Sequence, residues 1–207
     1  NLLQSLLSLT VSDLWIERGE RDLCKALSFS IRSGEIARIV GENGAGKSSL
    51  MKVLAGLMQP LEGKIVWGND DISQHRDLLQ QQLLYLGHNT GVKSLFSVEE
   101  NLRWYCPKAS AEQVATALSA VKLEGYEETP AQQLSAGQKR RIALARLWLT
   151  DKPLWLLDEP FTALDVKGVA TLEARLERHL QQGGLVMLTT HQPLDGRLSA
   201  REIALTP

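Results

Sequence analysis

The stretch GENGAGKSS at residues 41–49 constrains the fold of this chain more than any other feature of its sequence. It fits the pattern G-x-x-x-x-G-K-[S/T], which binds phosphate where a strand turns into a helix. The context agrees, because the apolar stretch Ile36–Val40 precedes it and the helix-like stretch Lys47–Leu57 follows, with Gly56 and Pro60 near its end. The motif by itself predicts a nucleotide-binding α/β fold and nothing more specific.

Each part of this loop has an expected contact with the nucleotide. Backbone N–H groups surround the β-phosphate, and the N-terminus of the following helix favours negative charge. We expect Lys47 to reach the β- and γ-phosphates and the Ser48 hydroxyl to ligate Mg²⁺. The structural alternative is a glycine-rich turn with a solvated lysine. The predicted nucleotide-binding residues of the loop are Gly41, Glu42, Asn43, Gly44, Ala45, Gly46, Lys47, Ser48 and Ser49.

The stretch LWLLDEP at 154–160 is a predicted buried strand that ends in two acidic residues. A carboxylate at this place in a nucleotide-binding protein holds Mg²⁺, usually through water, which suits Asp158. Glu159 is placed one residue further on, where it can orient and deprotonate an attacking water. The structural alternative is a pair of acids that end a strand before Pro160.

The stretch LVMLTTHQPL at 185–194 is another apolar strand, and His191 follows it. If this strand runs beside the Asp158 strand, His191 faces the γ-phosphate and donates to it, or holds the water and Glu159 in place. Taken alone, a histidine after a strand is more often a surface or hydrogen-bonded structural residue.

Composition restricts the class of protein. The 207 residues suit one domain of the larger sort, and 23 Lys and Arg against 24 Asp and Glu give a net charge of -1, without the basic field that nucleic acid or anionic lipid attracts. Cys24 and Cys106 are far apart, which is typical of a reduced intracellular protein. The N-terminal stretch lacks the basic region and cleavage site of a signal peptide. No segment approaches the roughly 18 apolar residues of a membrane span, so a role at a membrane would need another chain.

Strand-like and helix-like stretches alternate along the chain. Helical character is predicted from Val98 to about Leu123, and a turn at Arg18–Asp22. The strands are predicted at Leu9–Ile16, Cys24–Ile31, Ile36–Val40, Gly63–Trp67, Leu83–Leu86, Leu154–Leu157, Leu185–Thr189 and Ile203–Leu205. This order predicts a β-rich start, an α/β core and a helical insertion.

The polar stretch LSAGQKRR at 134–141 precedes the apolar run IALARLWLT and predicts the start of a helix. Ser135 and Gln138 fit the capping-box pattern. A plain helix start is the structural interpretation, and it is compatible with function, because free N–H groups and a hydroxyl at a helix N-terminus also receive a γ-phosphate. Lys139–Arg141 are interpreted as a solvated face rather than a nucleic-acid site.

These elements, in this order, resemble the ATP-binding subunits of ABC transporters. LSAGQ at 134–138 matches the LSGGQ signature of that family with Ala136 replacing a glycine, TALD at 162–165 matches its D-loop, and His191 its switch histidine. The resemblance covers essentially the whole chain. It implies a P-loop NTPase of the ABC type, with a RecA-like parallel-sheet core, an N-terminal antiparallel β-subdomain and a helical subdomain. It places the core at 1–90 and 147–207 and the helical subdomain at 91–146.

The resemblance also implies ATP and Mg²⁺ as cofactors and a second copy of the chain as partner. In this family the signature of one subunit closes over ATP held by the P-loop of the other, so that a head-to-tail pair encloses two ATP molecules. Glu159 and His191 become the catalytic residues, Ser48 and Asp158 the metal-binding residues, and Asp165 the D-loop residue. The residues that face the ATP of the opposing subunit are Ser135, Ala136, Gly137 and Gln138.

Two positions depart from the family pattern. Counted back from Glu100–Asn101, the Q-loop glutamine that touches Mg²⁺ and the attacking water falls at His88, with Asn89 next. Either residue is expected to substitute through a water, with His88 as the predicted metal-site residue. The aromatic residue that stacks on adenine falls near Arg18, with Trp15 close by. A guanidinium stacks on a purine, so we predict Arg18 at this place.

Longer stretches, including LDEPFTALDVKGVATL and QQGGLVMLTTHQPL, are similar to ATP-binding subunits of the haem exporters of cytochrome c maturation. Those subunits more usually carry His-Gln-Pro where this chain has His88, Asn89 and Thr90. The resemblance implies an ATPase at the cytoplasmic face of the bacterial inner membrane, bound peripherally to permease subunits. Its hydrolysis would drive haem export or release of a haem-loaded chaperone. Trp104 and Tyr105 are candidate contacts for the permease, with core packing as the alternative.

Other functions with the same ATP motifs stay open. The chain could serve an ABC transporter with another cargo, or act on nucleic acid as a non-transport ABC ATPase. The latter proteins generally carry two cassettes or a long coiled-coil insertion, which this chain does not have. We expect no nucleic-acid partner. We also expect no direct haem binding, because the chain contains no C-x-x-C-H motif.

Overall fold

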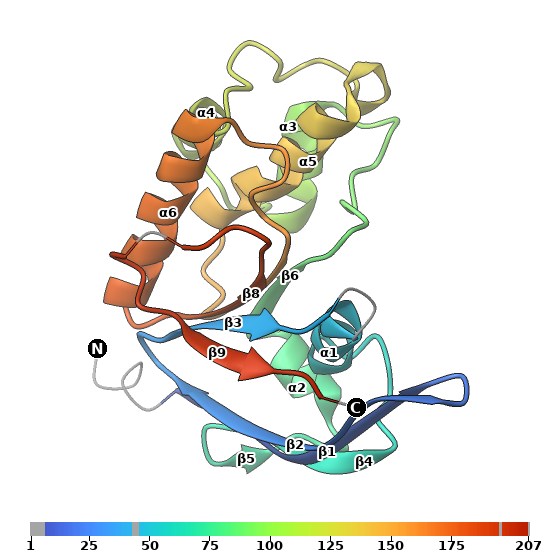
Figure 1. The fold of residues 1–207 in the computed structure, drawn as a ribbon. Coiled ribbons are helices and arrows are strands. Elements are labelled where there is room, and N and C mark those ends of the chain that lie inside the picture. The colour runs from blue at the N-terminus through green and yellow to red at the C-terminus, as the bar shows by residue number, and fades with distance from the viewer. Residues whose placement is uncertain (1–6, 43–45, 195, 207) are drawn as a thin grey trace. The chain divides into compact units, whose positions relative to one another are not determined.

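The computed structural model describes residues 7–42, 46–194 and 196–206. The chain divides into two compact units, which we call the sheet unit and the helical unit. The sheet unit holds the described residues of Asn1–Gly87, Lys152–Glu159 and Leu176–Pro207, and the helical unit holds His88–Asp151 and Pro160–Arg175. Figure 1 shows the elements of both, coloured along the chain.

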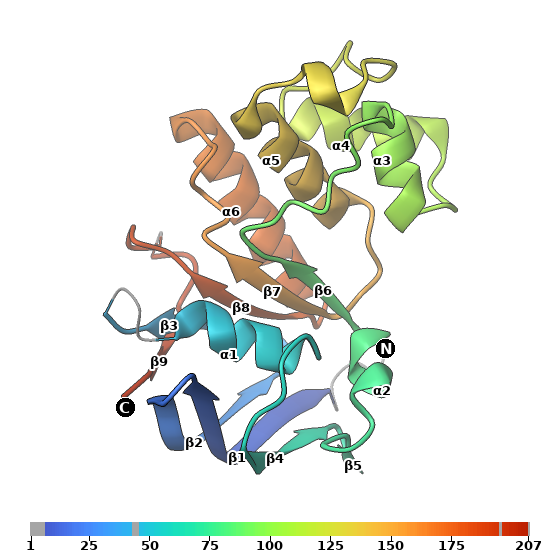
Figure 2. The same ribbon diagram turned by 90° about the vertical axis from the view of Figure 1, so that its right-hand side faces the viewer.

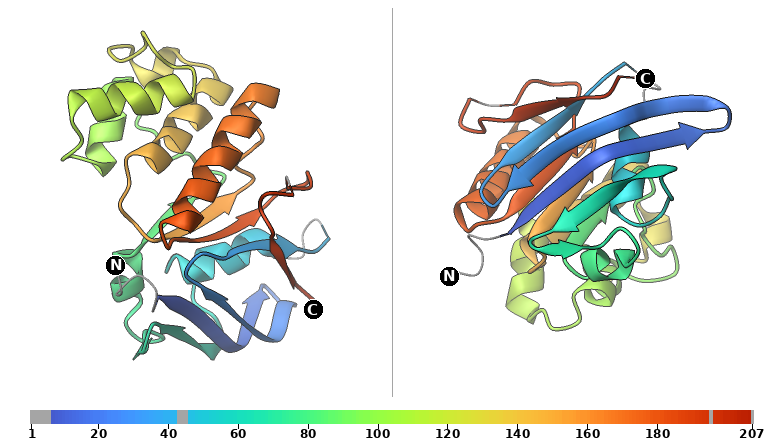
Figure 3. Two further views of the ribbon diagram at one scale, coloured as in Figure 1. Left: turned by 90° about the vertical axis from the view of Figure 1, so that its left-hand side faces the viewer. Right: turned by 90° about the horizontal axis from the view of Figure 1, so that it is seen from below.

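An antiparallel sheet opens the sheet unit, in the spatial order β2-β1-β4-β5. Its strands are β1 (Ser8–Arg18), β2 (Arg21–Arg32), β4 (Glu62–Trp67) and β5 (Asp70–Asp71). Figure 3 shows this sheet from below. Alternate residues of β1 are buried, and the alternation slips at Asp13, where the register shifts and φ is +52°. The slip lets both Val11 and Leu14 face the core. The predicted turn is shorter than expected, because Arg18 already pairs with Arg21.

A parallel sheet forms the other layer, in the order β6-β7-β8-β3-β9. Its strands are β3 (Ile36–Val40), β6 (Leu83–Leu86), β7 (Leu154–Asp158), β8 (Leu185–Thr189) and β9 (Arg201–Ala204). The strands predicted from the sequence are confirmed here, although β9 begins at Arg201 rather than Ile203. Both β7 and β8 are buried throughout, as central strands of a covered parallel sheet are. The carboxyl ends of β3, β7 and β8 meet at one edge, so the residues that follow them gather there.

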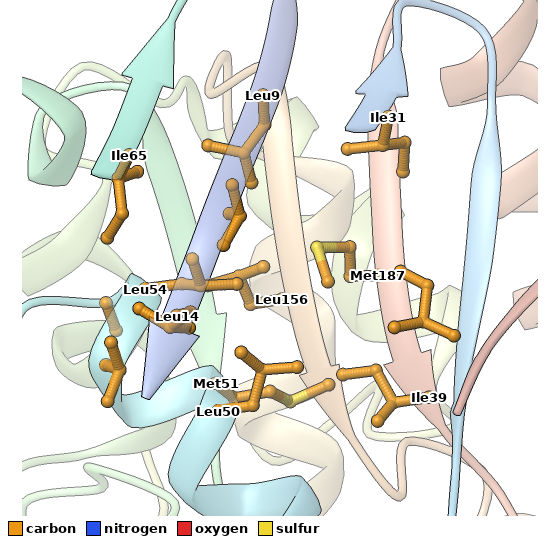
Figure 4. Packing of buried hydrophobic residues seen from close by; sticks show 14 of the residues in the cluster. Leu9, Leu14, Ile31, Ile39, Leu50, Met51, Leu54, Ile65, Leu156 and Met187 are labelled. Atoms are coloured by element: carbon orange, nitrogen blue, oxygen red, sulfur yellow. The ribbon is translucent and has the colours of Figure 1, made fainter. Parts of the chain in front are cut away.

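Helix α1 (Lys47–Leu54) lies between the two sheets of this unit (Figure 2). Its Leu50 and Met51 share one apolar cluster with Leu14 of the antiparallel sheet and with Leu156 and Met187 of the parallel sheet (Figure 4). Full burial of such a side chain contributes about 1.5–3 kcal/mol. The cluster therefore fixes α1 against both sheets.

Helix α1 is shorter than the sequence expectation, and a short helix before β6 was not expected. The predicted helix Lys47–Leu57 ends at Leu54, because Gly56 adopts a left-handed conformation with φ +80°. A short helix, α2 (Arg76–Gln80), precedes β6.

The helical unit contains α3 (Val98–Tyr105), α4 (Ala111–Ala120), α5 (Ala136–Ala145) and the 3₁₀ turns η2 (Ala131–Gln133) and η3 (Arg146–Trp148). Helix α6 (Val166–Gln181) begins in this unit and ends in the sheet unit. The predicted helical region that starts at Val98 is confirmed but divides into α3 and α4. Pro107 lacks the N–H that a continuous helix needs, and Ser110 begins α4 by accepting from the Gln113 N–H.

The predicted fold class is confirmed over the part of the chain that the structure describes. An antiparallel sheet comes first, a parallel sheet with α1 follows, and a mainly helical segment is inserted in sequence between β6 and β7. Among these described residues, no helix is long and apolar enough to cross a membrane.

Candidate functional site

Both described ends of the glycine-rich stretch lie at the carboxyl edge of the parallel sheet, one after β3 and the other at the start of α1. Gly41 and Glu42 follow β3 and are exposed, whereas Asn43, Gly44 and Ala45 lie outside the described residues. Gly46 precedes α1 with φ +92°, and a Cβ on it would lie only 2.7 Å from the Leu23 Cβ. Backbone conformation and space therefore both require glycine at this position. Lys47 begins α1, and no acidic residue occupies the first turn of the helix, which leaves its positive end for an anion.

Ser48 and Asp158 meet at this edge, as the predicted metal site requires. The Ser48 hydroxyl donates to the Asp158 Oδ2 over 2.7 Å. Asp158 ends β7 and is only 2% exposed. A carboxylate so deeply buried needs hydrogen-bond or cation partners to offset its loss of hydration. The contact joins residues that are far apart in sequence, because β8 and β3 bring the N-terminus of α1 to the end of β7.

Thr189, for which the sequence predicts no role, holds Asp158 at the end of β7 and Glu159 just after it in place. Its hydroxyl donates to the Asp158 Oδ1 over 2.7 Å and accepts from the Glu159 backbone N–H over 2.9 Å. Glu159 has φ +51°, a conformation that non-glycine residues rarely adopt. Strain of this kind costs about 1–3 kcal/mol and persists where surrounding contacts impose it, often at active sites. The Thr189 contact is one of those that hold Glu159 in this conformation.

His191 lies beside Glu159. The strand β8 pairs with β7 as predicted, with Thr189 level with Asp158. The His191 Nε2 is 3.1 Å from the Glu159 Oε1, and the imidazole is mostly exposed. The Arg38 guanidinium donates to the Thr190 carbonyl over 2.9 Å, which anchors the backbone just before His191. The structure thus brings together a hydroxyl, two carboxylates and an imidazole at one edge of the sheet.

Tyr85 of β6 is a second residue near this edge for which the sequence predicts no role. Burial raises the pKa of its phenol, and the negative charge of Asp158 raises that pKa further. The hydroxyl is therefore protonated at neutral pH and available as a donor.

The two candidates for the adenine platform differ in their surroundings. Arg18 is exposed at the end of β1. The Trp15 indole N–H donates to the Asp22 Oδ1 over 2.7 Å, and the Lys25 Nζ lies 4.6 Å from the centre of its ring. Because the ring of Trp15 already has a cation over it, Arg18 remains the better candidate.

The signature stretch forms the start of α5 in the helical unit. The predicted capping box is confirmed, since the Ser135 hydroxyl accepts from the Gln138 N–H and the Gln138 side chain accepts from the Ser135 N–H. In the described part of the chain no group accepts from the N–H groups of Ala136 and Gly137, as is usual in a first helical turn. The Lys139–Arg141 run continues along α5 and is half-buried.

A Cβ on Gly137 would meet nothing closer than the Ser135 Oγ at 4.0 Å, and its φ is not left-handed. Neither packing nor backbone conformation inside the described chain requires a glycine there. Gly137 therefore leaves open space beside the first turn of α5.

Asp165 caps the start of α6 in the same unit. Its Oδ1 accepts from the Gly168 N–H and its Oδ2 pairs with the Lys122 Nζ, each over 2.8 Å. The Lys122 contact, followed by the Gly168 N–H, lowers the pKa of Asp165. The same residues line a cavity of about 210 Å³ together with Arg141. His88, the predicted substitute for the Q-loop glutamine, is exposed and belongs to this unit.

The chain is similar in sequence to proteins of one family. Residues 24–162 match the model of the family described as ABC transporter. The chain is 52% identical, over 96% of its length and 97% of the relative, to the cytochrome c biogenesis ATP-binding export protein CcmA of Pectobacterium atrosepticum. It is 47% identical to the protein of that name from Escherichia coli K12, over 96% of each chain.

The fold of the chain is similar to the folds of solved ATP-binding proteins of ABC transporters. The structure described as the ATP-binding subunit of an ABC transporter has a TM-score of 0.79 at 26% identity, over 88% of this chain and 79% of that one. An ABC transporter ATP-binding protein from Pyrococcus furiosus has a TM-score of 0.80 at 22% identity, over 95% of this chain and 97% of that one.

Proposed function

Since the chain belongs to the ABC transporter family, we propose that it is the ATP-hydrolysing subunit of a membrane complex that serves cytochrome c biogenesis. The complex would use ATP to export haem or to release a haem-loaded chaperone. The observation that carries the ATPase part is the joined set of Ser48, Asp158, Thr189, Glu159 and His191 at the sheet edge. The names of relatives that are 47% and 52% identical support the part on cytochrome c.

The residues at the edge suit Mg²⁺–ATP. Mg²⁺ prefers oxygen ligands, keeps several waters and is commonly held by one or two protein oxygens together with phosphate. A hydroxyl and a carboxylate 2.7 Å apart, at the start of α1 and the end of β7, match this requirement. No group of three or more His, Cys, Asp or Glu that would form an all-protein metal site occurs among the described residues. Ser48 and Asp158 would hold Mg²⁺, which neutralises phosphate charge when bound, and Lys47 would contact the β- and γ-phosphates.

Glu159 is the proposed general base. Its carboxylate accepts a proton from water as the water oxygen bonds to the γ-phosphorus, while the bond from that phosphorus to the β–γ bridging oxygen breaks. The products are ADP and inorganic phosphate. His191, 3.1 Å from Glu159, is placed to keep the carboxylate oriented and to donate to the γ-phosphate.

The second half of the site comes from another copy of the chain. At the start of α5, Ser135 offers a hydroxyl, and Ala136 and Gly137 offer N–H groups that donate to no described residue. The approach at Gly137 is open, and this arrangement suits a γ-phosphate. ATP held by the loop before α1 in one copy would thus bridge to α5 of the other. Release of phosphate after hydrolysis removes this bridge, and the pair reopens.

A patch on the helical unit is the proposed contact for the permease. We define the aromatic patch as Lys93, Leu95, Phe96, Trp104 and Tyr105. Leu95 is 82% exposed and Trp104 59% exposed. The Trp104 ring lies against Phe96 with centroids 5.9 Å apart, and the Lys93 Nζ lies 4.6 Å from the centre of the Trp104 ring.

Tyr105 is a weaker candidate for this contact than Trp104. Arg146 stacks 3.6 Å from the centre of the Tyr105 ring, and the Tyr105 hydroxyl donates to the Gly91 carbonyl. Both contacts of Tyr105 are therefore made within the helical unit. The exposed faces of Leu95 and Trp104 are apolar and are suited to the core of an interface.

The test is to isolate the complex. Tagged Glu159→Gln protein, purified with ATP from gently solubilised membranes, should retain its partners because it cannot hydrolyse the bound ATP. Mass spectrometry should then identify integral-membrane subunits of cytochrome c maturation, and fewer of them should copurify with a variant that also carries Trp104→Ala. An unrelated permease would keep the ATPase but overturn the cargo. Ribosomes or nucleic acid alone would overturn the transport function.

A further inference from the structure

The ring of Tyr85 lies along β6 toward the carboxyl edge of the parallel sheet. Gly87, two residues further along, shows this direction, because a Cβ on Gly87 would overlap the Tyr85 hydroxyl oxygen and lie 2.6 Å from its Cζ. The hydroxyl of Tyr85 therefore occupies the space beside Gly87, just past the end of the strand. The rest of the ring packs on the apolar cluster of the sheet unit.

The register of the sheet places this hydroxyl beside Asp158. Strands β6 and β7 are parallel, with Tyr85 level with Leu156, so that Gly87 is level with Asp158. Side chains alternate along a strand, and Tyr85, Leu156 and Asp158 thus face the same side of the sheet. It is the side of α1, from which Ser48 donates to Asp158. The charge of Asp158 also contributes, after burial, to the raised pKa of Tyr85.

Gly87 is required by space and not by its backbone conformation. Its φ does not lie in the left-handed region, so backbone conformation does not demand glycine. What demands it is the space taken by the Tyr85 ring and hydroxyl. Gly87 thus leaves the space in which the phenol reaches the edge of the sheet.

The Tyr85 hydroxyl has no hydrogen-bond partner at this edge among the residues that the structure describes. Within the described residues, no side chain or backbone group forms a hydrogen bond with the Tyr85 hydroxyl. Tyrosine hydroxyls in half-buried positions usually find a partner. A donor directed at the carboxylate that is proposed to hold Mg²⁺ is suited to the phosphates and waters around that ion.

We propose that Tyr85 belongs to the ATP site, where its hydroxyl donates a hydrogen bond to a water or phosphate oxygen in the Mg²⁺–ATP complex beside Asp158. This inference rests on the proposed function and adds a contact to the same site. Gly87 leaves the space that the phenol of Tyr85 occupies. Its proposed role is to position Tyr85, and it does not contact ATP.

The test compares two variants that remove the contact by different routes. Tyr85→Phe deletes only the hydroxyl, whereas Gly87→Ala keeps the hydroxyl and displaces it. Tyr126→Phe is the matched control, because Tyr126 is a partly exposed tyrosine of the helical unit. The measurements are kcat and KM for ATP, Mn²⁺ affinity by paramagnetic resonance with ATP present, ATP affinity without divalent ions, and thermal unfolding.

We expect Tyr85→Phe to lower kcat about tenfold, the loss of about 1.4 kcal/mol of transition-state stabilisation. Mn²⁺ affinity should fall several-fold, while ATP affinity without metal and the melting temperature stay as in the unchanged protein. Gly87→Ala should repeat the kinetic and Mn²⁺ losses, and the double variant should lose no more than the stronger single variant. Tyr126→Phe should change none of these quantities.

Unchanged kcat and unchanged Mn²⁺ affinity in Tyr85→Phe would overturn the inference and leave Tyr85 as a packing residue. A loss of Mn²⁺ affinity in Gly87→Ala alone would overturn it as well, since the hydroxyl would then be irrelevant. If even the unchanged protein hydrolyses no ATP, the proposed function fails. The Mn²⁺ and ATP binding measurements would still decide whether Tyr85 contacts the metal–nucleotide complex.

Discussion

The two halves of the proposed ATP site hold their polar groups in opposite ways. In the sheet unit, Asp158 is buried, and it accepts from Ser48 and Thr189, which come from other elements. In the helical unit, Ser135 is exposed, and its hydroxyl bonds with Gln138 in its own helix turn. The first half depends on how distant strands pair, whereas the second half is complete within four residues of chain.

This difference assigns different physical tasks to the two halves. The buried half is preorganised, since each group already has its direction fixed before ATP arrives, which favours catalysis by lowering reorganisation. The exposed half is a receptor whose free N–H groups gain an acceptor only when phosphate from another copy approaches. Changes in the first half should therefore alter both chemistry and stability, and changes in the second should alter hydrolysis with little effect on ATP binding to one copy.

The largest expected effect is that of Glu159→Gln. Because the amide cannot accept the proton of the attacking water, ATP turnover should fall by about 10²–10⁴-fold. ATP binding should persist and the closed pair should accumulate, as shown by light scattering or gel filtration with ATP. Glu124→Gln, at an exposed position of the helical unit, serves as the charge-matched control. Normal hydrolysis by Glu159→Gln would remove Glu159 from its role as general base.

Ser135→Arg, in the other half of the site, should lower ATP turnover nearly as much as Glu159→Gln. A bulky cation at the N-terminus of α5 blocks the approach of ATP from a second copy, so turnover should fall on the order of 10²-fold, the scale of losing one preorganised donor. ATP binding to the monomer should be spared. Ser110→Arg is a close control, because Ser110 forms the same capping box at α4. Both variants should lose about 0.5–2 kcal/mol of stability.

Only Ser135→Arg should lose turnover. Equal ATPase losses in the two serine variants would trace the effect to helix capping, and an unaffected rate in Ser135→Arg would contradict a site shared between two copies.

We expect Thr189→Val, in the buried half of the site, to lower ATP turnover less than Glu159→Gln or Ser135→Arg does. The change leaves the Asp158 Oδ1 without this donor and the Glu159 N–H without this acceptor. Each buried group left unsatisfied costs about 1–3 kcal/mol. The strained Glu159 backbone should also relax, which would lower turnover about tenfold. Thr171→Val in α6, whose hydroxyl donates to the Lys167 carbonyl at an exposed position, controls for loss of a hydroxyl. A Thr189 variant with unchanged stability and rate would show that β7 alone orients both carboxylates.

The same contrast explains which parts of the site could be predicted from the sequence. The loop from Gly41 to Ser49, the acidic pair at the end of β7 and the capping box at Ser135 are each encoded within nine residues or fewer. Thr189 and Tyr85 carry no local pattern. Their relation to Asp158 depends on the register of β8 and β6 against β7, which the sequence does not specify until the sheet forms. The left-handed φ of Glu159 is also a product of contacts across the sheet.

The fold, too, has parts that could be predicted from the sequence and parts that could not. The apolar strands were predicted almost to the residue, because β7 and β8 are continuous apolar runs. The slip at Asp13 and the division into α3 and α4 were not predicted, since they depend on one residue in a left-handed conformation and on the capping at Ser110.

Gly137→Ala is the smallest expected effect and separates the two halves most cleanly, because stability and activity should move in opposite directions. The added methyl meets open space within the described chain and favours the helix, so the free energy of unfolding should rise by about 0.5–1 kcal/mol. The same methyl narrows the approach of phosphate from a second copy, so turnover should fall a few-fold at unchanged ATP affinity of the monomer. Glu112 holds the equivalent second helical position of α4, and Glu112→Ala controls for a change of side chain there. Unfolding in urea and steady-state ATPase rates measure the two quantities. A rise in stability with full activity would mean that nothing approaches α5 closely, and the shared site would then have to be built without the signature glycine.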